Sequence, residues 1–210
     1  MTQVKICGLT RTDDVRLACD LGASFVGFVF AAGSARRVSL AAARALAEAV
    51  SPGVARVGVF VNEDYSMISD AVRQARLDLA QIHQPLREED LRQIPVPVVA
   101  VTKVGEATEK PPDPELLGRC RAILFDTAGG ESHGGTGRHF DWNLVPSGDV
   151  RIPVFLAGGL DPENVGEAIR RLRPSAVDVS TGVEQSPGAK DPRKLAHFFE
   201  AVRQADAPAS

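Results

Sequence analysis

The chain has 210 residues, of which 44% are hydrophobic, 24% are charged and only 5% are aromatic. These values are typical of an ordinary globular protein and exclude a disordered or fibrous chain, and the length suits one large domain better than two. The net charge of −3 gives no long-range attraction to nucleic acid or to an anionic membrane, so an anionic ligand must be bound by local groups.

The cysteines and the first residues bear on location and on metal binding. Cys7, Cys19 and Cys120 are odd in number and lack paired spacing, which argues against a disulfide framework and a zinc site and favours a reducing compartment. The first thirty residues contain neither a signal peptide nor a long apolar run. We therefore expect a cytoplasmic protein that makes no contact with membranes or nucleic acid.

Eight short apolar runs recur along the chain, and a helical or turn-rich stretch separates each from the next. Their residues are apolar at consecutive positions, which is typical of parallel strands buried on both faces. The runs are Val4–Leu9, Phe25–Phe30, Arg56–Val61, Leu79–His83, Val98–Val101, Ala122–Thr127, Val154–Ala157 and Ala176–Ser180.

Helix patterns lie between these runs. Ser39–Val50 is rich in strong helix formers, and Asp64–Arg76 carries its apolar residues on one face. Three Asp-Pro pairs are typical of helix starts, because the carboxylate accepts from free backbone N–H groups and proline suits the first turn. These pairs are Asp113-Pro114, Asp161-Pro162 and Asp191-Pro192.

Eight strands alternating with helices in about 200 residues predict a single (β/α)8 barrel, an α/β fold, over residues 1–205. An open doubly wound sheet is the second possibility. Residues 206–210 are expected to form a frayed tail. In a barrel of this kind the functional groups lie at the carboxyl ends of the strands, where the loops converge.

Cys7 ends the first predicted strand, directly before Gly8. It is either a small buried apolar residue or a catalytic thiol whose thiolate form the adjacent loop stabilises. Asp126 follows the apolar residues of the sixth strand. It is either a cap for loop amides or a carboxylic acid whose pKa is raised by apolar surroundings, so that it can donate a proton.

Two glycine-containing turns follow the seventh and eighth strands. Either alone is a tight turn, but together they form the phosphate site found in many such barrels, because glycines and a helix start expose backbone N–H groups. The candidate phosphate-binding residues are Gly158, Gly159, Ser180, Thr181 and Gly182.

Other residues at these strand ends are candidates for substrate binding. Arg36, after the second strand, can bind a carboxylate if it faces the pocket. His83 ends the fourth strand and is either a hydrogen-bonded structural histidine or a substrate contact. Gly135 belongs to the glycine-rich loop Gly134–Gly137, which is predicted to be either a plain connection or a lid. No nucleotide-binding loop, HExxH motif or cluster of metal ligands occurs, so we expect a reaction without cofactor or metal.

Several motifs together give the chain a family resemblance. They are KICGLT, GFVF with SARR, RVGVFVN, LFDT, GGTGRHFDW, LAGGLDPENV and AVDVSTGVEQSPGAKD. This set closely resembles the phosphoribosylanthranilate isomerases of tryptophan biosynthesis along nearly the whole chain. The resemblance implies a (β/α)8 barrel that catalyses, without a cofactor, the Amadori rearrangement of N-(5-phosphoribosyl)anthranilate to 1-(2-carboxyphenylamino)-1-deoxyribulose 5-phosphate.

The resemblance also implies a role for individual residues. Cys7 matches the general base and Asp126 the general acid, while Arg36 matches the arginine that meets the anthranilate carboxylate. Asp178 matches a substrate-contacting aspartate, and the residues of the two glycine turns match the phosphate loops. The implied partner is a small phosphorylated sugar–anthranilate substrate; the sequence leaves monomer and homodimer open.

Two stretches depart from the family pattern. Relatives read QLHG after the fourth strand where this chain reads QIHQPL, and their fifth-strand lysine is replaced by Val99-Ala100-Val101, with Lys103 shortly after. A sugar-phosphate-binding barrel without catalysis, or with altered specificity, is therefore the alternative function. A dual-substrate isomerase that also serves histidine biosynthesis is disfavoured, because such enzymes carry an aspartate where this chain has Cys7.

Overall fold

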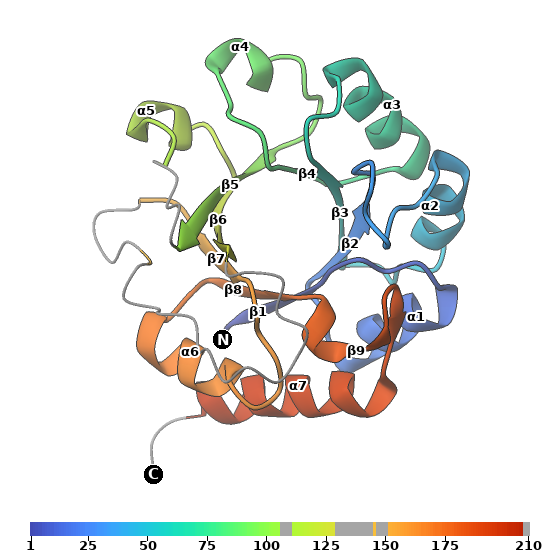
Figure 1. Cartoon of the computed structure of the whole chain (residues 1–210), viewed down its shortest axis with the longest axis vertical. Coiled ribbons are helices and arrows are strands. Elements are labelled where there is room, and N and C mark those ends of the chain that lie inside the picture. The colour runs from blue at the N-terminus through green and yellow to red at the C-terminus, as the bar shows by residue number, and fades with distance from the viewer. Residues whose placement is uncertain (106–110, 129–144, 146–150, 208–210) are drawn as a thin grey trace.

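Eight parallel strands close into a barrel, shown end-on in Figure 1. The computed structural model describes residues 1–105, 111–128, 145 and 151–207. The strands are β1 (Gln3–Ile6), β2 (Phe25–Val29), β3 (Ala55–Phe60), β4 (Leu79–Ile82), β5 (Val98–Gly105), β6 (Ala122–Ala128), β7 (Val154–Ala157) and β8 (Ala176–Val179). The predicted (β/α)8 barrel is confirmed. The open-sheet alternative is wrong, because β1 pairs with β8 from Gln3 opposite Ala176 to Ile6 opposite Val179.

The helices lie outside the ring of strands (Figure 1). They are α1 (Thr12–Leu21), α2 (Leu40–Ala47), α3 (Tyr65–Ala75), α4 (Glu88–Leu91), α5 (Pro114–Leu117), α6 (Val165–Leu172) and α7 (Pro192–Asp206). After β8 a short 3₁₀ helix, η2 (Thr181–Val183), leads into a small antiparallel hairpin of β9 (Glu184–Ser186) and β10 (Ala189–Lys190). None of the helices in the described ranges is long and apolar enough to cross a membrane.

The strands are buried on both faces, as their continuous apolar runs predict. One apolar cluster joins strand residues to helix residues and therefore fills the layer between barrel and helices. A second cluster, which includes Phe25, Leu79, Leu124 and Phe155, contains strand residues alone and fills the barrel interior. These side chains fill the interior of the barrel. Polar residues that point inward near the carboxyl ends of the strands must therefore lie at the mouth.

Local capping explains where the helices begin. Ser39 accepts a hydrogen bond from the Ala42 amide at the start of α2, and such a cap contributes about 1 kcal/mol. Asp113 and Asp191 cap α5 and α7, as predicted. Asp161 differs: its carboxylate accepts from the amides of Glu163 and Asn164 and closes a turn, so that α6 begins only at Val165.

The last helix is longer than the sequence predicts. α7 includes Asp206, which was expected in a frayed tail, and the Asp206 carboxylate accepts a hydrogen bond of 2.8 Å from the Thr2 hydroxyl. This contact joins the two ends of the chain, because the barrel closure places β1 beside β8 and α7 beneath them. Residues 208–210 lie outside the described ranges.

Candidate active site

The predicted site residues lie at one mouth of the barrel because of strand parity. Side chains two residues apart on a strand point to the same side. Ala176 of β8 belongs to the interior cluster, so Asp178 and then Ser180 follow it toward the mouth. Leu124 on β6 is followed in the same way by Asp126, and Leu79 on β4 by Gln81 and His83.

A buried ion pair occupies the centre of this mouth. Lys5 Nζ lies 2.6 Å from Asp178 Oδ2, and their side chains are only 1% and 6% exposed. Lys5 and Asp178 stand opposite each other in the β1–β8 register, so the closure of the barrel makes the pair. Within the described part of the chain, Asp178 Oδ1 is buried without a hydrogen-bond partner, which leaves one carboxylate oxygen for a ligand.

Lys5 is a site residue that sequence reasoning missed. The signal for it is a lysine in the middle of an otherwise apolar strand. Lysine is almost never fully buried unless it is paired. Its position two residues before Cys7 already placed both side chains on one side of β1.

The Cys7 thiol lies beside this ion pair and is half-buried. Burial raises the pKa of Cys7, the Lys5 ammonium lowers it by charge and hydrogen bonding, and the Asp178 carboxylate raises it; the net pKa is above its ordinary value. Gly27 of β2 gives the group its space, because a Cβ there would lie 2.9 Å from Cys7 Sγ and 3.3 Å from Lys5 Nζ.

Asp126 is influenced by the same charges. Burial raises the pKa of its carboxyl, the Asp178 carboxylate raises it further, and Lys5 and Lys103 only partly oppose this. Cys7 and Asp126 therefore lie around the same ion pair. β5 runs to Gly105, beyond its predicted end at Val101, and Lys103 stands opposite Asp126 in the β5–β6 register.

His83 is neutral at physiological pH. Burial, together with the charges of Lys5 and Lys103, lowers the pKa of its imidazole to about 4. Its Nε2 lies 2.9 Å from the side-chain nitrogen of buried Gln81. The structure places His83 near the mouth as a neutral hydrogen-bonding group.

The two predicted phosphate turns lie against each other. A Cβ on Gly182 would lie 2.0 Å from the Leu160 carbonyl oxygen, so the turn after β8 directly contacts the turn after β7. Gly158 and Gly159 have φ values of 87° and 64°, which favour glycine. The Ser180 hydroxyl is buried and, among the described residues, has no hydrogen-bond partner. These features form a cradle of backbone and hydroxyl groups suited to an anion.

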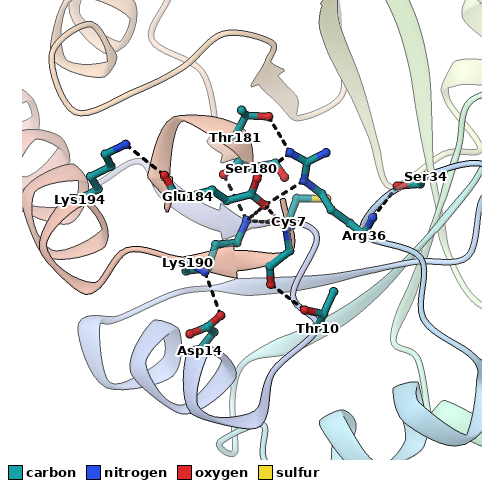
Figure 2. A network of polar contacts seen from close by, with 11 residues as sticks. Cys7, Thr10, Asp14, Ser34, Arg36, Ser180, Thr181, Glu184, Lys190 and Lys194 are labelled. Atoms are coloured by element: carbon teal, nitrogen blue, oxygen red, sulfur yellow. Dashed lines mark hydrogen bonds and ion pairs between the residues drawn. The ribbon is translucent and has the colours of Figure 1, made fainter. Parts of the chain in front are cut away.

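Arg36 reaches this cradle from the loop after β2. Its Nε donates to Glu184 Oε1 at 2.8 Å, and its Nη2 donates to Glu184 Oε2 at 2.6 Å and to the Thr181 hydroxyl at 3.1 Å (Figure 2). Among the described residues Nη1 has no hydrogen-bond partner and is available to a ligand. Glu184, which the sequence analysis did not single out, fixes the guanidinium in a bidentate pair.

Gly135 and the rest of the loop Gly134–Gly137 lie outside the described ranges. Among the residues that the structure does describe, no group of three or more histidine, cysteine or acidic side chains is arranged to hold a metal ion. The remaining predicted site residues come together at one mouth: Cys7, Arg36, His83, Asp126, Asp178, Gly158, Gly159, Ser180, Thr181 and Gly182.

Comparison with known proteins gives a consistent result. The family model described as N-(5'phosphoribosyl)anthranilate (PRA) isomerase matches residues 4–201. A protein of Acidithiobacillus ferrooxidans named N-(5'-phosphoribosyl)anthranilate isomerase is 41% identical, and the match covers 97% of this chain and 98% of that protein.

Solved structures agree in fold and in sequence. The phosphoribosyl anthranilate isomerase of Thermotoga maritima superposes with a TM-score of 0.84 at 39% identity, over 97% of this chain and 100% of that one. A phosphoribosyl anthranilate isomerase in complex with reduced 1-(o-carboxyphenylamino)-1-deoxyribulose 5-phosphate gives a TM-score of 0.81 at 37% identity, over 97% and 100% of the two chains. This chain belongs to the N-(5'-phosphoribosyl)anthranilate isomerase family.

Proposed function

We propose that this chain catalyses the Amadori rearrangement of N-(5'-phosphoribosyl)anthranilate, with Asp126 as the general acid and Cys7 as the general base. Asp126 gives a proton to the ribose ring oxygen, the bond from that oxygen to C1 breaks, and the anthranilate nitrogen forms an iminium with C1. Cys7 then removes the proton from C2, and the C–H electrons form the enolamine, which tautomerises to the ketone product. No other reactant is needed.

A single observation carries this proposal: two proton-transfer groups lie around one buried ion pair, Lys5–Asp178, at the mouth where the two glycine turns form a cradle suited to an anion. A raised pKa keeps a larger fraction of Asp126 protonated near neutral pH, as an acid catalyst requires. Cys7 must act as a thiolate, and the Lys5 ammonium next to it stabilises that form. Each positioned proton-transfer group contributes typically about 10²–10⁴-fold to the rate.

The proposed substrate contacts use the polar groups at the mouth that have no hydrogen-bond partner among the described residues. The substrate phosphate binds between Gly159 and Gly182, where the Ser180 hydroxyl and backbone N–H groups donate hydrogen bonds to its oxygens. Arg36 Nη1 meets the anthranilate carboxylate, and Asp178 Oδ1 contacts the sugar or the iminium nitrogen. Holding the substrate at both charged ends orients the sugar between acid and base.

The three cysteines are free thiols, which supports a reducing, cytoplasmic location as part of this proposal. His83, neutral at pH 7, is assigned a hydrogen bond to substrate. Gly135 is assigned to substrate binding.

The test is an assay of the purified protein with N-(5'-phosphoribosyl)anthranilate, followed by the loss of its anthranilate fluorescence. We expect saturable conversion to a product whose mass is unchanged and whose carbonyl is reducible by borohydride. Binding of the substrate, measured by fluorescence anisotropy, without conversion would instead support the non-catalytic barrel and overturn the proposed function.

A further inference from the structure

A second buried lysine, Lys190, lies behind the proposed base. It comes from the β9–β10 hairpin, where it pairs with Glu184 in the antiparallel register, and its side chain is 0% exposed. Nothing in the proposed chemistry uses it. Figure 2 shows its ammonium at the centre of a polar network that joins Cys7, Ser180 and Glu184.

All three protons of this ammonium have an acceptor. Lys190 Nζ donates to the backbone carbonyl of Cys7 at 2.6 Å, to that of Ser180 at 3.1 Å and to Glu184 Oε1 at 2.9 Å. The first acceptor is at the end of β1 and the second at the end of β8. One side chain therefore joins the peptide that carries the proposed base to the peptide that carries the proposed phosphate-binding hydroxyl.

The hairpin that delivers Lys190 is docked independently on the loop after β1 and on the first turn of α1. The Thr10 hydroxyl donates to the Gly188 carbonyl at 2.6 Å, and the Lys190 amide donates to Asp14 Oδ2 at 3.0 Å. Gly188 itself has a φ of 81° and would carry a Cβ only 3.1 Å from the Thr10 hydroxyl. These contacts fix the backbone at Lys190 without any help from its side chain, which contacts β1 and β8 separately.

Neutralising Glu184 does not account for this lysine. Arg36 already forms a bidentate pair with both Glu184 oxygens, so the carboxylate has its counter-charge without Lys190. With two cations and one carboxylate, the cluster has a surplus of one positive charge next to the proposed phosphate turn. A buried ammonium is expensive to desolvate, so a well-packed apolar residue would serve better if Lys190 only filled space.

We propose that Lys190 is a positioning residue for catalysis: by binding the carbonyls of Cys7 and Ser180 together, it fixes the Cys7 thiol relative to the bound phosphate group and stabilises its thiolate form. The proposal rests on the proposed function, because it assigns Lys190 to the base of that reaction. Lys190 acts through the backbone and through its charge, without touching the substrate.

The electrostatics agree with this geometry. The charged groups around the Cys7 thiol are Lys5 on its own strand, Asp178 on β8, Lys190 on β10 and Arg36 on the loop after β2. The pKa of Cys7 is raised by burial, and Lys5 and then Lys190 are the cations that lower it. The pKa of Lys190 is itself lowered by burial, while the Glu184 charge and hydrogen bond oppose that shift.

The experiment compares Lys190→Met, Lys190→Gln and the matched control Lys194→Met. Lys194 is an exposed lysine whose Nζ donates to the backbone carbonyl of the same Glu184 at 3.0 Å. It reaches neither β1 nor β8. Three quantities are measured for each folded variant: kcat and KM for N-(5'-phosphoribosyl)anthranilate, and the pH dependence of Cys7 alkylation by iodoacetamide, read by peptide mass spectrometry.

We expect kcat of Lys190→Met to fall at least about tenfold, with a smaller change in KM, because the thiol loses its fixed distance from the sugar. The alkylation profile of Cys7 moves to higher pH by roughly one unit in both neutral variants, because a nearby cation is lost. Lys190→Gln keeps hydrogen-bond donors and retains more kcat than Lys190→Met. Lys194→Met behaves like the parent protein.

A folded variant with kcat within twofold of the parent and an unshifted alkylation profile would overturn the proposal. If Lys190→Met does not fold, as judged by circular dichroism, Lys190→Gln decides the question by the same two readouts. Alkylation does not require turnover. A parent protein without isomerase activity would therefore sink the proposed function, while the alkylation profiles would still decide whether Lys190 controls the Cys7 thiol.

Discussion

At the scale of single residues, the site pairs two groups whose protonation states oppose their ordinary ones. Asp126 must be protonated and Cys7 deprotonated for the proposed reaction. Burial raises the pKa of both groups, which favours the required form of Asp126 and opposes the required form of Cys7. The pH profile of kcat/KM is therefore expected to show two limbs, one from the titration of each group.

The raised pKa of Asp126 predicts that the folded protein becomes more stable when this carboxyl group is replaced by an amide. The raised pKa of Asp126 means that the folded protein binds this proton more tightly than the unfolded chain. Its contribution to stability is full below the unfolded pKa and is lost as pH rises through the folded pKa. Asp126→Asn should therefore raise Tm at pH 7.5, by a margin that shrinks as the pH is lowered toward 5.

The control for this experiment is Asp70→Asn, which changes an exposed carboxylate beside Arg73 and should alter stability by no more than about 0.5 kcal/mol. Differential scanning fluorimetry from pH 5 to pH 8 makes the comparison. An Asp126→Asn variant with a lower Tm than the parent at pH 7.5 would show that the carboxylate stabilises the fold.

Arg36 offers a second prediction at this scale. Because Glu184 and Thr181 hold its Nε and Nη2, the guanidinium is fixed in one orientation, which leaves Nη1 for the proposed carboxylate contact. Arg36→Met should raise KM at least about tenfold with little change in kcat, and Arg36→Lys should not restore it, since a lysine lacks the planar fork. An unchanged KM in Arg36→Met would refute the carboxylate contact.

At the scale of elements, the strand ends carry the proposed catalytic residues and the two glycine turns form the proposed phosphate cradle. The eight strands were predictable from their consecutive apolar residues, and Cys7, Asp126 and Asp178 from their places at or near strand ends. The extension of β5 to Gly105 was not, because Thr102 and Lys103 interrupt its apolar run. Strands of three and two residues carry no detectable period, so the β9–β10 hairpin was missed and Lys190 with it.

The ion-pair partners could not be predicted from the sequence either. The partners Lys5 and Asp178 are separated by 173 positions, and Arg36 and Glu184 by 148. Only the closure of the barrel brings each pair together, and a local pattern carries no information about it. Lys5 could have been predicted as a site residue from the sequence. Its partner could not, because only the β1–β8 register shows that Asp178 lies opposite it.

The turns after β7 and β8 contact each other at Gly182, and this close approach predicts the effect of a side chain there. A Cβ at Gly182 would collide with the Leu160 carbonyl, which is backbone and cannot rotate away. Gly182→Ala should therefore separate the turns and weaken inhibition by inorganic phosphate at least about tenfold, the loss of one or more charge-assisted hydrogen bonds.

The matched control is Gly53→Ala. Gly53 has a φ of 88° and open space around it, and it precedes β3, at the other end of the barrel. Alanine there costs about 1–2 kcal/mol of stability through its left-handed backbone and should leave phosphate inhibition intact. Equal phosphate inhibition in Gly182→Ala and the parent would rule out the proposed cradle.

At the scale of the whole molecule, the pairing of β1 with β8 closes the barrel and builds the site in one step. The Lys5–Asp178 ion pair lies across this seam, and the Thr2–Asp206 contact joins the chain ends outside it. Stability and function are therefore coupled at the seam, because the groups that close the barrel also set the charge at its mouth.

This coupling predicts a partial rescue. Lys5→Met leaves Asp178 buried without its counter-charge and should lower the free energy of unfolding by about 3–5 kcal/mol. Lys5→Met/Asp178→Asn removes both charges and should recover much of that loss while remaining inactive. Urea denaturation measures the first effect, with the exposed Arg203→Met as a control, and a double variant no more stable than Lys5→Met would show that the pair is not coupled.

The central claim is that Cys7 and Asp126 transfer the protons in an Amadori rearrangement. Its most direct test is single-turnover conversion of N-(5'-phosphoribosyl)anthranilate by the parent protein, Cys7→Ser and Asp126→Asn, each at saturating protein. We expect the rate constant of each variant to fall by about 10²–10⁴-fold, with unchanged affinity for reduced 1-(o-carboxyphenylamino)-1-deoxyribulose 5-phosphate. A near-parental rate constant in either variant would contradict the claim for that residue.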